Sequence, residues 1–182
     1  MRIVRYLLMA AAVLGLAASL GYIAFQPSSP AIGPVAAGTP SATDAPLSVT
    51  RLDGSTMLLE ELKGEIVILD FWATWCGPCI TEIPHYNQLD ADYRDKGVHL
   101  LGVTLQSGTI EEVTAFAADE AHRISYPLVL GNDGIVGAYG PIWGFPTTLL
   151  IDRQGKVVKR WLGADPRKNE QLRELLDDML EG

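Results

Sequence analysis

From residue 47 onward, short runs of consecutive apolar residues alternate with longer segments in which apolar residues recur every three or four positions. The runs over 65–73 and 98–106 are almost continuously apolar, as in strands buried on both faces of a sheet. Residues 76–96, between them, have the pattern of a helix that Gly97 ends. This order predicts a β-α-β unit with two parallel strands.

The same patterns predict the remaining elements of an α/β fold. A helix is expected over 109–122, with Thr109 as its N-cap and Glu112 completing a capping box. The other expected elements are a short strand over 126–131, a hairpin over 147–163 that turns at Gln154-Gly155, and an amphipathic helix over Asn169–Leu180. The closing hairpin adds antiparallel strands, so we expect a central mixed sheet flanked by helices.

A further hairpin is expected at the start of this domain. Residues 47–62 contain two short strand-like segments about Asp53-Gly54, a dipeptide typical of type I′ turns. We therefore predict one domain over 47–182, with an N-terminal β-hairpin extension.

The first 46 residues differ in character from the rest. After Arg2 and Arg5, residues 6–25 carry no charge, and a helix of roughly 20 apolar residues spans a bilayer. We expect a membrane anchor over 1–25, with the domain on the extracytoplasmic or periplasmic side. A cleaved signal peptide is the alternative, although the run exceeds the usual ~7–15-residue apolar core of such peptides. Residues 26–46 are rich in Pro, Ala, Ser, Thr and Gly, which predicts a flexible linker.

Charge and cysteine content narrow the function. The formal net charge is −8 and the sequence pI is about 4.8, so there is no general basic footprint for nucleic acid. Two cysteines cannot form the disulfide framework of a small secreted domain. The pair is therefore expected to be redox-active or to belong to a metal site.

Both cysteines, Cys76 and Cys79, lie at the expected junction of a strand and a helix. Unpaired N–H groups and the helix dipole stabilise a thiolate at a helix N-terminus, so we expect Cys76 to attack a disulfide. Cys79 follows one helical turn later and is expected to resolve the mixed disulfide. Gly77 and Pro78 between them add no charge, and proline suits the first turn of a helix.

Other uses of a Cys-x-x-Cys pair fit this chain less well. A structural zinc site needs four ligands, and His85, His99 and His122 stand at no finger-like spacing. A c-type haem site needs His directly after the second Cys, where this chain has Ile80. We therefore expect no metal, and no cofactor other than a redox-active disulfide.

Two carboxyl groups stand near the cysteines in the sequence. Asp70 interrupts the apolar run over 65–73, and a charge there is costly unless it is paired or protonated. We expect its pKa to be raised, so that it accepts the proton of Cys79. Glu82 follows Cys79 by three residues on nearly the same helical face. It either assists this proton transfer or is an ordinary solvated carboxylate.

Four tryptophans and one histidine are assigned from their positions. Trp75 directly precedes Cys76 and is expected to shield the thiols and offer an apolar surface to partners. Trp72 either flanks the thiols or packs in the core. Trp143 and Trp161 are expected to pack in the core or on the surface, and His85 to lie on the surface of the helix.

The segment "FWATWCGPC" resembles the active site of the thioredoxin superfamily, and "GFPTTLLIDRQGKVV" resembles its second signature. The resemblance implies a thioredoxin fold in which Pro146 is a cis-proline beside the disulfide and the backbone of Phe145 pairs with substrate. Asp70 matches the buried acid of this superfamily, and Pro84 matches the proline within its active-site helix. Glu82, the N-terminal hairpin and the insert over 107–131 resemble the branch of TlpA- and ResA-like proteins.

This branch implies an anchored, extracytoplasmic protein disulfide reductase, often active in cytochrome c biogenesis. Its partners would be disulfide-containing extracytoplasmic proteins and a membrane thiol electron donor. The substrate contacts implied here are Trp75, Gly77, Pro78, Phe145 and Pro146.

Two other functions are weighed against it. A copper-binding assembly factor would use the thiolates of Cys76 and Cys79 as ligands for Cu(I). A thiol peroxidase would need a peroxidatic Cys with Thr and Arg beside it, and Thr74 has no evident Arg partner.

Overall fold

A computed structural model describes residues 47–182 of the chain, and the predicted anchor over 1–25 and linker over 26–46 lie outside this part. The elements are β1 (Ser48–Arg51), β2 (Thr56–Leu58), η1 (Leu59–Leu62), β3 (Ile66–Trp72), α2 (Gly77–Tyr93), η2 (Arg94–Lys96), β4 (Val98–Thr104), α3 (Ile110–Ala118), β5 (Leu128–Leu130), α4 (Asp133–Tyr139), β6 (Thr147–Ile151), β7 (Val157–Leu162) and α5 (Lys168–Glu181). Within the described range, no helix is long and apolar enough to cross a bilayer.

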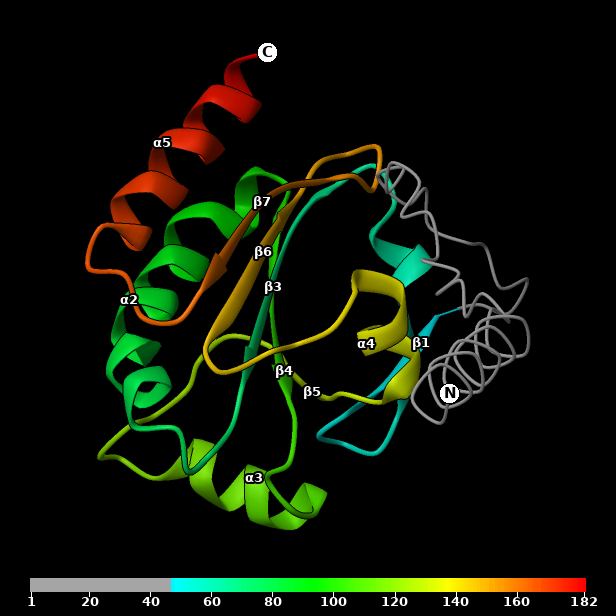
Figure 1. Cartoon of the computed structure of the whole chain (residues 1–182), viewed down its shortest axis with the longest axis vertical. Helices are drawn as coiled ribbons and strands as arrows, with labels where there is room; N and C mark the ends of the chain where they lie inside the picture. The colour runs from blue at the N-terminus through cyan, green and yellow to red at the C-terminus, as the bar shows by residue number, and fades with distance from the viewer. Residues whose placement is uncertain (1–46) are drawn as a thin grey trace, which may run out of the picture. The chain divides into compact units, whose positions relative to one another are not determined.

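Strand β3 is an interior strand, next to the central β4, of a seven-stranded sheet with the order β2-β1-β5-β4-β3-β6-β7 (Figure 1). It pairs in parallel with β4 and antiparallel with β6, and all of its residues are buried. Helix α2 connects β3 to β4, and β6 and β7 form the closing hairpin. The predicted α/β fold with a mixed sheet flanked by helices is therefore confirmed.

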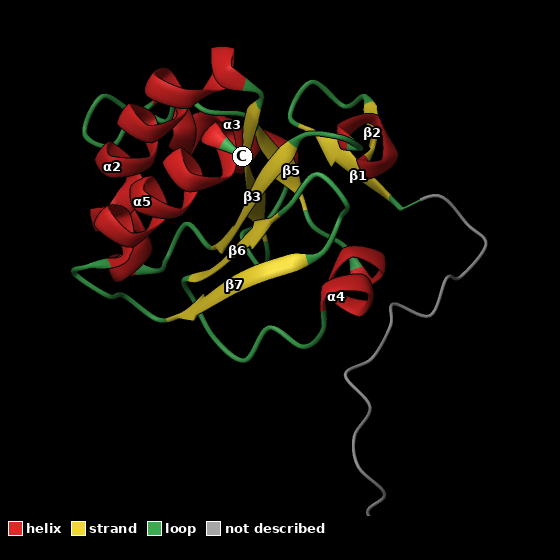
Figure 2. Cartoon of the chain, turned by 90° about the horizontal axis from the view of Figure 1, so that it is seen from above, coloured by secondary structure: helices red, strands yellow, loops and turns green. Residues whose placement is uncertain are grey.

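The side chains of β3 alternate between the two faces of the sheet, as the period of a strand requires. Val67, Leu69 and Phe71 belong to the core on the face covered by α4 and η1. The even-numbered apolar residues of β3 belong to the core formed with α2, α3 and α5. Figure 2 shows α2 and α5 on one side of the sheet and α4 on the other. Asp70 is even-numbered, so its carboxyl group faces α2 and α5.

The N-terminal hairpin is present and joins the sheet through antiparallel pairing of β1 with β5. Its predicted type I′ turn is wrong, because such a turn needs positive φ at both central residues and only Gly54 has it (φ 83°). The Gly54 N–H donates to Arg51 O, and the Arg51 N–H donates to Ser55 O (2.9 and 2.8 Å). The loop therefore has three residues and ends with a left-handed glycine, which is the next commonest hairpin connection.

Two helices differ from the sequence prediction. Helix α3 has the predicted Thr109–Glu112 capping box, but it ends at Ala118 rather than near residue 122. Its end follows from Asp119, whose carboxylate accepts a hydrogen bond from the Ala121 N–H (2.8 Å) and so favours a turn. Helix α4 was not predicted, although Asn132 caps it by accepting a hydrogen bond from the Ile135 N–H (3.0 Å).

Candidate active site

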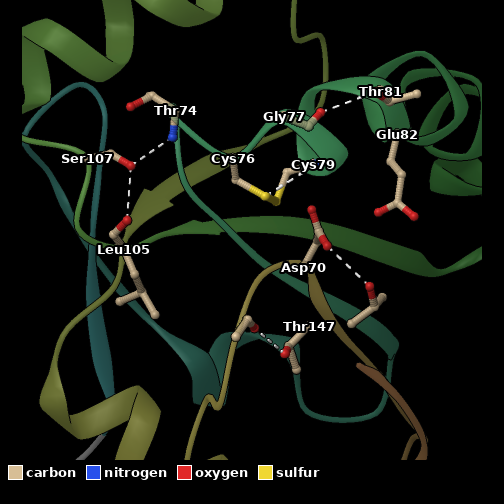
Figure 3. The surroundings of a disulfide bond; sticks show 12 residues. Asp70, Thr74, Cys76, Gly77, Cys79, Thr81, Glu82, Leu105, Ser107 and Thr147 are labelled. Atoms are coloured by element: carbon tan, nitrogen blue, oxygen red, sulfur yellow. Dashed lines mark hydrogen bonds between the residues drawn. A yellow bond between two sulfur atoms is a disulfide. The ribbon is translucent and has the colours of Figure 1, made fainter. Parts of the chain in front are cut away.

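The two cysteines lie where β3 gives way to α2. Cys76 is the N-cap residue of α2, and its Sγ accepts a hydrogen bond from the Cys79 N–H (3.3 Å). The two sulfurs are joined in a disulfide, with the Cα atoms 5.3 Å apart (Figure 3). Because the first N–H groups of a helix have no partner within it, this position favours negative charge on the Cys76 sulfur after reduction.

A neighbouring loop holds the segment that leads to Cys76. The Thr74 N–H donates to Ser107 Oγ (3.0 Å), and this hydroxyl donates to Leu105 O (3.0 Å). The indole N–H of Trp75 donates to Gln106 O (2.8 Å). Gln106 has φ of 52°, which is uncommon for a residue other than glycine. Two hydrogen bonds, from Thr74 and from Trp75, thus hold the segment after β3 against the segment after β4.

A pocket of about 450 Å³ lies beside the disulfide, and only one of the two cysteines lines it. Its lining includes Cys76 but not Cys79, and the predicted substrate contacts Trp75, Gly77, Pro78 and Phe145 also line it. The Phe145–Pro146 peptide is cis, as predicted, and Pro146 itself is buried. A partner that enters this pocket therefore meets Cys76 first.

Aromatic side chains surround this pocket. Trp75 is 62% exposed and packs edge-on against Phe145, with ring centroids 5.7 Å apart. A core position for Trp143 is wrong, because this residue is 81% exposed and lines the pocket. Trp72 and Trp161 are buried, in agreement with their predicted packing roles. The surface beside Cys76 is therefore open and apolar.

Behind the disulfide the surroundings are polar and closed. Asp70 is only 2% exposed, and its carboxyl points toward the disulfide in Figure 3. In the sheet it lies directly opposite Thr148 of β6, whose hydroxyl donates to Asp70 Oδ1 (3.2 Å). The Tyr86 hydroxyl of α2 is 2.8 Å from the same Thr148 oxygen.

A buried lysine joins this group from the C-terminal helix. Lys168, the first residue of α5, donates from Nζ to Thr148 Oγ1 (3.2 Å) and to Glu82 Oε2 (2.7 Å). The side chains of Lys168 and Glu82 are 4% and 13% exposed. Glu82 is therefore a paired, largely buried group, so its interpretation as a solvated carboxylate is wrong. We call Asp70, Thr148, Tyr86, Lys168 and Glu82 the acid network.

Burial dominates the protonation of both carboxyls. Desolvation raises the pKa of Asp70 to about 7, while the positive charge of Lys168 opposes the rise and the negative charge of Glu82 adds to it. Burial likewise raises the pKa of Glu82, against the stabilising hydrogen bond and charge of Lys168. Asp70 is thus close to half-ionised near neutral pH, which suits a group that accepts and returns a proton.

Comparison with known proteins identifies the family. The model of the Redoxin family matches residues 36–176. The chain belongs to the redoxin family. It is 36% identical over 133 residues to the thiol-disulfide oxidoreductase ResA of Bacillus thuringiensis (strain Al Hakam), with 72% of this chain and 71% of that protein aligned. It is 31% identical over 131 residues to the thioredoxin-like protein YneN of Bacillus subtilis (strain 168), with 71% and 75% aligned.

A solved structure supports the same assignment. The thiol:disulfide interchange protein, thioredoxin family protein, from Chlorobium tepidum TLS aligns with a TM-score of 0.63 and 27% identity over 75% of this chain and 94% of that one. The redoxin is accordingly a thiol–disulfide oxidoreductase with a Cys76–Cys79 pair, and its thioredoxin fold is confirmed. The roles assigned to Asp70 and Glu82 stay predictions.

The residues of this site that were missed in the sequence include Lys168, Thr148 and Trp143. Lys168 stands four and eight positions before Leu172 and Leu176, so it continues the buried stripe of α5. Thr148 alternates with Leu150 on the α2 side of β6, and Thr148 is directly opposite Asp70. For both Lys168 and Thr148, the sequence signal was a polar residue at a position where the period of the helix or strand predicts a buried side chain. Trp143 had no comparable signal, because its position relative to Cys76 depends on the loop that precedes β6.

For the copper alternative, the structure offers the two thiolates of Cys76 and Cys79. In the part of the chain that the structure describes, no cluster of three His, Cys, Asp or Glu side chains is placed to hold a metal ion. Cys76 and Cys79 would thus supply two thiolates without a third ligand from residues 47–182.

Proposed function

We propose that this redoxin is an extracytoplasmic protein disulfide reductase that passes two electrons from Cys76 and Cys79 to disulfide-containing partner proteins. The observation that carries the proposal is the different setting of the two cysteines. Both cysteines are buried in the core that contains α2 and α5, but only Cys76 also lines the pocket that opens to solvent. A two-step exchange needs one sulfur that a partner can reach and a second that is kept for resolution.

The first step forms a mixed disulfide. The Cys76 thiolate attacks one sulfur of the partner disulfide, so that a Cys76–partner bond forms, the partner bond breaks, and the other partner sulfur leaves as a thiolate. Trp75, Trp143 and Phe145 offer apolar contact to the partner around this sulfur. The N-terminus of α2 stabilises the attacking thiolate.

The second step releases the partner. Asp70 accepts the proton of the Cys79 thiol, and the resulting thiolate attacks Cys76 Sγ. The Cys76–Cys79 disulfide forms, and the partner leaves with its second sulfur as a thiolate. Two electrons have then moved to the partner, and the oxidised redoxin needs a thiol donor before the next cycle.

The direction and setting are supported by the sequence. The resemblance to TlpA- and ResA-like proteins favours reduction of partners in cytochrome c maturation. The uncharged run over 6–25, preceded by Arg2 and Arg5, supports a membrane anchor and a membrane thiol donor. An extracytoplasmic reductant requires such a donor, because that compartment is oxidising.

The standard potential of the Cys76–Cys79 couple, measured in glutathione buffers, tests the direction. We expect a value below about −220 mV, on the side of thioredoxin rather than of the oxidant DsbA near −120 mV. The reduced protein should also reduce a peptide that carries a Cys-x-x-Cys-His disulfide. A potential near that of DsbA, or failure to reduce the peptide, would contradict the proposal.

A further inference from the structure

Lys168 occupies a position that helix stability does not explain. It is the first residue of α5, where the helix dipole disfavours a positive charge. Its side chain is nevertheless only 4% exposed, and a buried ammonium is costly unless it is paired and hydrogen-bonded. Its two partners, Glu82 and Thr148, both belong to the acid network behind the disulfide.

The hydroxyl of Thr148 connects Lys168 to Asp70, because it accepts a hydrogen bond from Lys168 and donates one to Asp70. A threonine hydroxyl has one proton to donate and two lone pairs, and a lysine ammonium only donates. Lys168 therefore occupies one lone pair of Thr148. With Asp70 ionised, Thr148 donates to Asp70 and accepts from Tyr86. With Asp70 protonated, the same chain of hydrogen bonds can reverse without moving a heavy atom.

One ammonium serves two carboxyl groups in this network. Asp70 faces Glu82 and Tyr86 from α2, Lys168 from α5 and Tyr126 from the segment before β5. Lys168 is the one positive charge in this set, and it lowers the pKa of Asp70 while Glu82 raises it.

Glu82 has further charged neighbours. His85 on α2 lowers the pKa of Glu82, and Asp165, which precedes α5, raises it. The groove between α2 and α5, of about 770 Å³, is lined by Glu82, His85, Asp165 and Lys168, and it offers the network a route to solvent.

We propose that Lys168 is a positioning residue for the release step, which keeps Asp70 ionised and hydrogen-bonded until Asp70 accepts the proton of Cys79. The inference rests on the proposed function, since it assigns Asp70 as the base of that step. The proton passes from Cys79 to Asp70 and must leave Asp70 again, so that Asp70 is ionised for the next cycle. Lys168 itself neither gains nor loses a proton.

The test is the pH dependence of partner release in the full chain. Lys168→Met keeps most of the side chain and removes the charge, so the midpoint of the release rate should move to higher pH by about one unit, and release at pH 7 should slow about fivefold. Glu82→Gln removes the competing carboxylate, so its midpoint should move to lower pH. Attack by Cys76 should keep its rate in both variants.

Matched controls separate charge from packing. Arg173→Met removes another ion pair between α5 and α2, Arg173–Asp92 (2.8 Å), and should leave the midpoint unchanged. Lys168→Arg retains the charge and should return the midpoint toward that of the original protein. A uniform loss of rate at every pH in Lys168→Met, without a shift of the midpoint, would overturn the proposal.

A second measurement does not depend on activity or on the Met variant. The Asp70 carboxyl can be titrated by NMR in the oxidised protein and in Glu82→Gln. We expect the Asp70 midpoint to fall in Glu82→Gln, and an unchanged midpoint would refute the coupling. If the protein reduces no partner while these midpoints shift as expected, the proposed function fails and the coupling stands.

Discussion

The two sides of the disulfide differ in polarity and in exposure to solvent. Beside Cys76 the surface is apolar and open, with Trp75 and Trp143 among the most exposed large side chains. Behind Cys79 the interior holds Asp70, Lys168 and Glu82, with little or no exposure. This reverses the usual distribution, in which large apolar groups are inside and charges outside.

The reversal matches what each step requires. Recognition of varied partners is served by apolar contact area that gains from leaving water. Proton transfer is served by a low-dielectric setting, where a carboxyl can be held close to half-ionised at neutral pH. A single exposed site could not provide both conditions, so the fold uses the disulfide as the boundary between them.

The strongest test of this boundary is to remove each sulfur in turn. Cys76→Ser should abolish partner reduction and trap no partner, since the pocket then holds no thiol. Cys79→Ser should still attack and should accumulate mixed disulfides, which non-reducing gels detect. Equal trapping by both variants would mean that the two sides are not distinct.

Removing the base should affect the closed side alone. Asp70→Asn should slow partner release by ~10²–10⁴-fold, the range of general-base assistance, and leave the attack of Cys76 nearly intact. Stopped-flow reduction of a model disulfide, followed by Trp75 fluorescence, separates the two steps. A variant slowed in the first step and not in the second would contradict the assignment of Asp70.

The same substitution should make the protein more stable at alkaline pH. The pKa of Asp70 is about 7 in the folded state and about 3.9 when unfolded, so the native state binds more protons between these values. The free energy of unfolding should therefore fall as pH rises through this window, by on the order of 4 kcal/mol, and this loss should be absent in Asp70→Asn. Chemical denaturation at pH 4 and pH 8 measures it, and equal pH dependence in both proteins would show that Asp70 is not desolvated.

The smallest expected effect lies on the open side. Trp143→Ala should raise the KM for a protein disulfide by about tenfold, a typical cost of truncating an exposed aromatic anchor at an interface. Reduction of a small disulfide reagent should not change, because such a reagent needs only the sulfur. Val158→Ala, an exposed apolar residue on β7 that does not line the pocket, is the matched control. An equal loss with the small reagent would show that Trp143 supports Cys76 itself.

The open side was largely predictable from the sequence, because local patterns determine it. The apolar run before Cys76 and the glycine after residue 96 indicate a strand and a helix, and the N-cap position follows from their junction. Trp75 is adjacent to Cys76, so its location needed no tertiary information. Trp143 is the exception, and its role became evident only from the path of the loop before β6.

The closed side was predictable only in part. The cost of burying Asp70 could be argued from its own strand. Its partners could not, since Thr148 is 78 residues from Asp70 and Lys168 is 86 residues from Glu82. Helix α4 was not predicted for a different reason. Its seven residues include two glycines, Gly134 and Gly137, and show too little periodicity to indicate a helix.

The distance of Lys168 along the chain also orders events during synthesis. The cysteine motif leaves the ribosome first, and the 86 residues that separate Glu82 from Lys168 take roughly 4 to 17 s to follow at ~5–20 residues per second. During this interval Asp70 and Glu82 are already part of the chain, but the ammonium that pairs with Glu82 is not. The acid network is therefore completed only when the start of α5 has been made and has docked against α2 and β6.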